Sequence, residues 1–161
     1  MGKFMDVFRA DLLVNAPDFK PSGNFPASGE WQRYVTEHFD DFVNGTNLHF
    51  WTCGAPIAKC EKRLLIGAAT YSQMDMQLLD VLDDWLKKHE SMGTRIDVFD
   101  LGICSQINDL DEFFPHVKNV YMTPHVGLWE NGVFQEMITG YAARGFLSKH
   151  LDIPFQLLTF K

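Results

Sequence analysis

The strongest constraint on the fold is a nearly continuous apolar run between Arg63 and Ala69. A run without alternation is typical of a central strand that is buried on both faces. Residues 75–89 then place apolar side chains at helical spacing, and residues 95–101 alternate as a strand does. A strand, a helix and a second strand in that order favour a parallel crossover within an α/β fold.

The rest of the chain adds elements of the same two kinds. Apolar spacing predicts helices over 30–43, 107–114 and 142–151, a strand that ends at 12–14, and strands over 120–129 and 133–141. Asn131-Gly132 lies between the last two strands, which is a strong hairpin signal. Residues 48–53 fit one more strand, which residues 54–56 would break. The predicted fold is α/β, with a mixed sheet flanked by helices on both faces.

Length and charge narrow the class of protein. The 161 residues, 46% of them hydrophobic, most simply make one domain with a substantial core, residues 1–161. The net charge is −7, and residues 75–112 account for all of it, because they hold ten acidic side chains and three basic ones. Such a segment repels a phosphate backbone, so nucleic acid is not an expected partner. Two alternatives remain for it, a solvated acidic helix face and a docking surface for a basic partner.

The sequence also bears on the cellular compartment of the protein and on its oligomeric state. No apolar run reaches the ~20 residues of a membrane helix, and the start at Met1 has no apolar secretory core. Cys53, Cys60 and Cys104 are few and odd in number, which favours reduced thiols. We therefore expect a cytoplasmic protein without membrane contact. An aromatic fraction of 14% fits a crowded core or an apolar interface, so a homo-oligomer stays an open alternative.

The order of elements over residues 62–160 resembles the thioredoxin fold. Met122-Thr123-Pro124 is similar to the family segment whose proline is cis, and Glu130-Asn131-Gly132 is similar to its Lys-Asn-Gly turn. Gly140 falls where a glycine follows the last strand of the family. In this alignment residues 1–29 are an N-terminal extension, and residues 46–61 are an insertion before the central strand.

The redox motif of that family is missing from its expected place. Tyr71-Ser72-Gln73-Met74-Asp75 stands where thioredoxins carry Trp-Cys-Gly-Pro-Cys. Without sulfur there, disulfide exchange at this place is excluded. The Ser-x-x-Asp pattern instead favours a variant capping box, in which Ser72 accepts from an early backbone N–H of the helix. The alternative is that Ser72 donates to a bound thiol or anion, as in glutathione-type enzymes of related fold.

The resemblance also implies a binding groove. The family binds extended peptides by strand addition beside its cis proline, which corresponds here to Thr123 and Pro124, with Tyr71, Ser72 and His125 at the same groove. Alternatively, Pro124 only shapes the edge of the sheet, and His125 is a packing or surface residue. The leading hypothesis is a non-redox binding module, a chaperone, assembly factor or complex subunit, that holds a protein or peptide and needs no cofactor.

A competing hypothesis makes the chain an enzyme. Cys53 and Cys60 enclose six residues, so they cannot share one helix turn as the cysteines of Cys-x-x-Cys do. A reversible disulfide between them would give a thiol-disulfide oxidoreductase with relocated cysteines, and the alternative is two ordinary thiols. The histidines have no ligand spacing with one another or with cysteine, so no metal site is expected.

Overall fold

The fold is known from a computed structural model, which describes residues 4–5, 38–52, 55, 59, 62–70, 72–89, 94–101 and 123–159. Residues 38–44 are helical, in agreement with the end of the helix predicted over 30–43. The predicted strand at 12–14 and the predicted helix over 107–114 lie outside the described residues. So do Tyr71, Cys53, Cys60 and Cys104.

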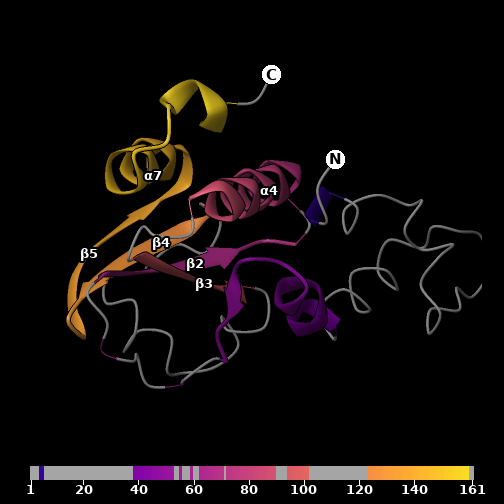
Figure 1. The fold of residues 1–161 in the computed structure, drawn as a ribbon, viewed down its shortest axis with the longest axis horizontal. Coiled ribbons are helices and arrows are strands. Elements are labelled where there is room, and N and C mark those ends of the chain that lie inside the picture. Colours follow the sequence, from indigo (N-terminus) through magenta and orange to yellow (C-terminus); the bar gives the residue numbers. More distant parts are fainter. Residues whose placement is uncertain are drawn as a thin grey trace, which may run out of the picture.

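The centre of the fold is a mixed sheet of five strands, as predicted for its class (Figure 1). The strands are β1 (His49–Phe50), β2 (Lys62–Ala68), β3 (Thr94–Asp100), β4 (His125–Glu130) and β5 (Val133–Thr139), in the order β1-β3-β2-β4-β5. β1 and β2 run parallel to β3, whereas β4 runs antiparallel to β2 and β5. The parallel crossover and the antiparallel hairpin at one edge are therefore confirmed.

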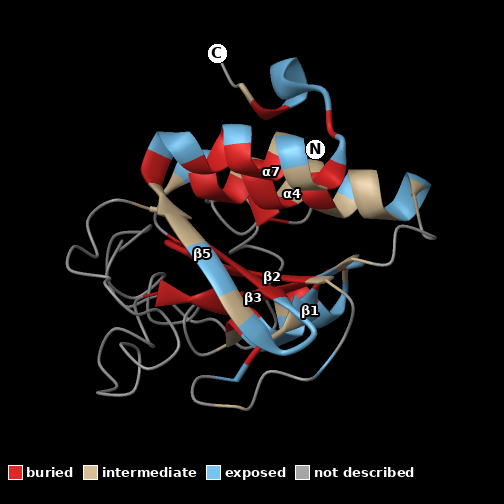
Figure 2. Ribbon diagram, turned by 90° about the vertical axis from the view of Figure 1, so that its left-hand side faces the viewer, coloured by how far each residue is buried: buried red, intermediate tan, exposed pale blue. Residues whose placement is uncertain are grey.

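Two helices lie side by side over one face of this sheet (Figures 1 and 2). They are α4 (Gln73–Lys88), which links β2 to β3, and α7 (Ala143–Leu151), which follows the short 3-10 helix η1 (Gly140–Ala142). A second 3-10 helix, η2 (Phe155–Leu158), comes after α7. The prediction of helices on both faces is therefore confirmed for one face. The helix predicted over 107–114, after β3, lies outside the described residues.

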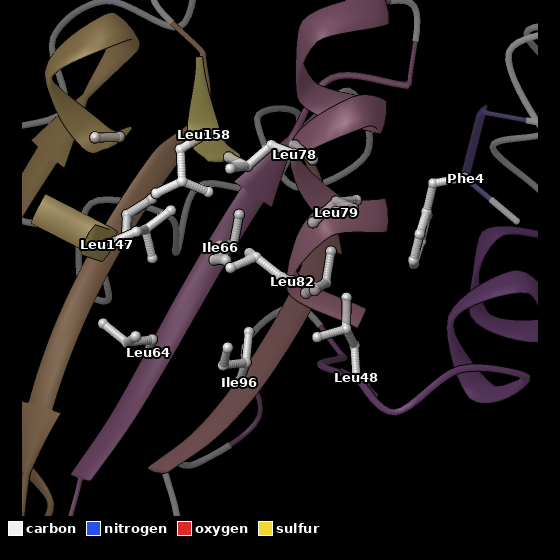
Figure 3. Packing of buried hydrophobic residues seen from close by; sticks show 14 of the residues in the cluster. Phe4, Leu48, Leu64, Ile66, Leu78, Leu79, Leu82, Ile96, Leu147 and Leu158 are labelled. Atoms are coloured by element: carbon white, nitrogen blue, oxygen red, sulfur yellow. The ribbon is translucent and has the colours of Figure 1, made fainter. Parts of the chain in front are cut away.

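Burial on both sides explains the apolar run in β2. Leu64 and Ile66 pack into the large cluster beneath the helices, while Leu65 packs into a smaller cluster on the opposite face. Alternate residues of a strand point to opposite faces, so a strand covered on both sides needs apolar residues at successive positions. Figure 3 shows side chains of α4, α7 and η2 converging on Leu64 and Ile66.

The hairpin between β4 and β5 has the predicted turn. Asn131 and Gly132 have φ angles of 53° and 83°. Positive φ at both central residues is the requirement of a type I′ turn, which asparagine and glycine tolerate best. β4 begins at His125 rather than at residue 120, because Thr123 and Pro124 are not part of the ladder. Within the described residues, no helix combines the length and apolarity required to span a bilayer.

Candidate binding site at the start of helix α4

Ser72 is the N-cap of α4. Its backbone is extended, with φ −95° and ψ 114°, and its Oγ accepts a hydrogen bond from the Asp75 N–H at 3.3 Å. Its carbonyl oxygen accepts from the Met76 N–H at 3.1 Å. The Ser72 hydroxyl oxygen thus satisfies an N–H group that the first turn of a helix leaves unpaired, as the capping prediction required.

Asp75 departs from the capping box in one respect. In that motif the acidic side chain reaches back to the N-cap N–H, but Oδ2 of Asp75 accepts from the Ala69 N–H at 2.8 Å. The Ser72 N–H is already bonded to the Ala69 carbonyl oxygen at 3.0 Å. Asp75 therefore joins the end of β2 to the first turn of α4, which closes the loop between strand and helix.

The carboxyl group of Asp75 is buried, with 2% of the residue exposed. Burial raises the pKa of Asp75, because a charged carboxylate loses hydration there. The Ala69 N–H, the side chains of Thr123 and Ser72, and the positive charge of Arg144 act on this pKa in the opposite direction. Asp75 therefore lies within interaction range of both Thr123 and α7.

Thr123 and Pro124 lie beside this carboxyl group, directly before β4. The peptide bond between them is cis, which is the geometry that the resemblance implied for Pro124. The Pro124 carbonyl oxygen accepts from the Gly140 N–H at 3.0 Å. In contrast, the backbone N–H and C=O of half-buried Thr123 take no part in the hydrogen bonds found among the described residues.

His125 is the first residue of β4, where it is paired in register with Gly67 of β2 and Thr139 of β5. Its side chain is completely buried. A ligand in solvent has no access to such a side chain, so the packing alternative describes His125 better than a place on the groove surface. The structure thus gathers Ser72, Thr123 and Pro124 at one end of the sheet and separates His125 from solvent.

Three buried polar residues at the same end of the sheet were not predicted as site residues. They are Thr70, Asp100 and Arg144, exposed by 4%, 2% and 3%. Asp100 ends β3 opposite Ala68 of β2, so these parallel strands finish together. The carboxyl ends of parallel strands are the usual position of ligand sites in α/β proteins. A polar residue at or just beyond the end of an apolar strand was the available signal for Asp100 and Thr70. Nothing in the sequence indicated burial of Arg144.

The fold and the site together define a mixed α/β protein that has buried polar residues and a capped helix start near the carboxyl ends of its parallel strands. No known protein family, curated protein or solved structure matches the chain. In the described part of the chain, no three His, Cys, Asp or Glu side chains are grouped closely enough to hold a metal ion.

Proposed function

We propose that this chain is a thioredoxin-like binding module without redox activity, which holds an extended protein or peptide segment beside Thr123 and Pro124. The proposal is supported by the strand order and by the place of Ser72 and Asp75 at the start of α4, where the resemblance aligns them with the two family cysteines. The observation that carries it is that the backbone N–H and C=O of Thr123, next to the start of α4, bond to no other residue that the structure describes.

The backbone N–H and C=O of Thr123 suit strand addition, in which a bound peptide pairs with the main chain as an extra strand. A peptide that pairs with Thr123 obtains main-chain hydrogen bonds, which do not depend on the side chains of the peptide. The neighbouring Ser72 hydroxyl oxygen accepts the capping bond from the Asp75 N–H, and Asp75 itself is buried. The chemistry available at the described part of the site is adhesion to a polypeptide, as expected of a chaperone, assembly factor or complex subunit.

The test starts from peptides selected against the purified chain from a random displayed library, with reductant present. Binding is compared between each selected peptide and versions N-methylated at alternate backbone amides. Methylation on the paired edge is expected to weaken binding at least tenfold, because it removes main-chain donors, while methylation on the other edge has little effect. Hydrogen exchange of the Thr123 amide should slow when peptide is bound.

Matched variants complete the test. Thr123→Val keeps the backbone groups and should retain binding, and Cys53→Ser with Cys60→Ser should retain it as well, because no thiol takes part. A library that gives no binders, equal effects of the two methylation patterns, or protection that maps away from Thr123 would overturn the proposal. Loss of binding in the double cysteine variant would favour the oxidoreductase hypothesis instead.

A further inference from the structure

Two arginines and an aspartate form a charged cluster near the beginnings of β2 and β3. Arg63 and Arg95 are neighbours in register, and Asp97 lies two residues after Arg95 on the same face of β3. Leu64 and Ile96, the next residues of the two strands, point into the core beneath the helices (Figure 3). Because successive residues of a strand alternate, the charged cluster lies on the face of the sheet opposite to α4 and α7.

The charges of this cluster do not cancel. Oδ2 of Asp97 pairs with Nε of Arg63, and Oδ1 pairs with Nε of Arg95 at 3.1 Å. A guanidinium group is always charged in proteins, so two positive charges share one negative charge. Arg63 is 5% exposed and Asp97 is completely buried, and charges in such positions are screened less than surface charges. The cluster therefore keeps an excess of one positive charge.

The two arginines also have hydrogen-bond donors to spare. In each side chain, Nε alone has a partner among the residues that the structure describes. Nη1 of Arg63 is buried and has no hydrogen-bond partner in this part of the chain. A buried charged donor without an acceptor is costly. The side chain of Arg95 is 46% exposed, so the pair of guanidinium groups is buried at Arg63 and open to solvent at Arg95.

His49 of β1 adds a third side chain to this face. It is exposed and pairs in register with Asp97, which places it beside the two arginines. Partial burial lowers the pKa of His49, and the positive charges of Arg95 and Arg63 lower it as well, whereas the negative charge of Asp97 raises it. The imidazole therefore interacts electrostatically with both arginines. It is mostly neutral at neutral pH, and a neutral imidazole still donates one hydrogen bond.

We propose that Arg63, Arg95 and His49 bind a phosphate group, either free or in a small ester. Donors from three adjacent strands suit a tetrahedral group with several acceptor oxygens, whereas a single guanidinium fork is enough for a planar carboxylate. A phosphate group also offsets the excess positive charge of the cluster. The net charge of −7 on the chain repels a nucleic-acid backbone, so a small phosphate compound fits better than a polymer.

This site is separate from the groove of the proposed function. The cluster lies near the start of β2, whereas Thr123 lies beside the loop that follows the end of β2. The inference therefore does not rest on peptide binding at Thr123.

The experiment is an NMR titration of the full chain, labelled with ¹⁵N, at neutral pH and constant ionic strength. The probes are inorganic phosphate, methyl phosphate, acetate and chloride. The Nε–H signal of Arg95 and the ring signals of His49 are identified by their loss in Arg95→Gln and His49→Ala. We expect both sets of signals to shift saturably with phosphate, and to shift much less with acetate and chloride. The tighter binder of the two phosphate compounds shows whether the site prefers the free ion or an ester.

Variants test the role of each side chain. Arg95→Gln should weaken phosphate binding about tenfold, because charge-assisted hydrogen bonds are lost, while Asp97 keeps Arg63 as its partner. Arg95→Lys keeps the charge without the fork and should have an intermediate affinity. His49→Ala should weaken binding about two- to fivefold, which is the range for one neutral hydrogen bond. The matched control is Lys149→Gln, which removes an equal charge from an exposed residue of α7 and should leave binding unchanged.

Three results would overturn the inference. They are the absence of saturable shifts with either phosphate compound, equal affinities for phosphate and acetate, and an equal loss of affinity in Arg95→Gln and Lys149→Gln. None of these results bears on peptide binding beside Thr123, so failure of either proposal can be recognised separately.

Discussion

At the scale of single residues, two arginines of the sheet share the carboxylate of one buried aspartate. Asp97 is completely buried in β3, where one carboxylate oxygen pairs with Nε of buried Arg63 and the other with Nε of half-exposed Arg95 at 3.1 Å. Charged side chains are almost never buried unless they are paired. These three residues interrupt otherwise apolar strands, and the sequence predicted β2 and β3 without predicting that the arginines share one carboxylate.

Asp75 provides the test at the residue scale. Burial, the largest cause, raises the pKa of Asp75 in the folded chain above its ordinary value of 3.8, so the folded chain holds the proton more tightly than the unfolded chain. Protonated Asp75 therefore contributes to the free energy of unfolding. This contribution is fully present below pH 3.8, and it is lost as the pH rises through the pKa of Asp75 in the folded chain. Asp75→Asn stays neutral and keeps an oxygen that can accept from the Ala69 N–H. We expect its free energy of unfolding, relative to the natural chain, to rise from acidic to neutral pH.

The measurement is urea denaturation of both proteins at several pH values from about 3.5 to 8. Curves of unfolding free energy against pH that stay parallel for the two proteins would contradict the burial argument for Asp75.

At the scale of elements, the sequence predicted those helices, strands and turns that have local signals, and it did not predict features that depend on tertiary packing. β2, α4 and the β4–β5 hairpin were predicted because a continuous apolar run, a helical stripe and Asn131-Gly132 are each local signals. β1 has only two residues, and its pairing with β3 depends on tertiary contact. The same holds for the site, because Ser72 was predicted as a cap from its spacing to Asp75, whereas the bond from Asp75 to Ala69 and the nearness of Arg144 arise only after folding.

Two glycines in different elements should respond in opposite ways to a methyl group. A Cβ at Gly67 in β2 would lie 2.6 Å from Cζ of Phe99 and 2.9 Å from Cδ2 of Leu101, inside the smaller core cluster. Gly67→Ala should therefore cost about 1–3 kcal/mol through overpacking. A Cβ at Gly145 in α7 meets nothing within 4 Å, so Gly145→Ala should add about 0.5–1 kcal/mol of stability through helix propensity. Chemical denaturation of the two variants decides, and the argument fails if both change stability in the same direction.

At the scale of the whole molecule, the beginning of the chain is part of the central core. Phe4 is completely buried and lies 6.4 Å from the Phe39 ring, centroid to centroid. The carboxylate oxygens of Asp80 in α4 accept hydrogen bonds from the backbone N–H groups of Phe4 and Met5, which come 76 and 75 residues earlier in the sequence. Figure 3 places Phe4 at the side of α4, near Leu79. A sequence cannot predict this contact, because nothing local to Phe4 indicates which helix it joins.

This contact predicts that an early residue contributes as much to stability as a residue of the sheet. Phe4→Ala removes a fully buried ring and should lower the free energy of unfolding by about 3–5 kcal/mol. The matched control is Phe155→Ala in η2, where 43% of the residue is exposed and the expected change is within about 0.5 kcal/mol. Both are measured by urea denaturation with the slope of the transition compared as well. Similar losses in the two variants would mean that Phe4 does not belong to the cooperative core, since only a buried ring leaves a cavity behind when it is removed.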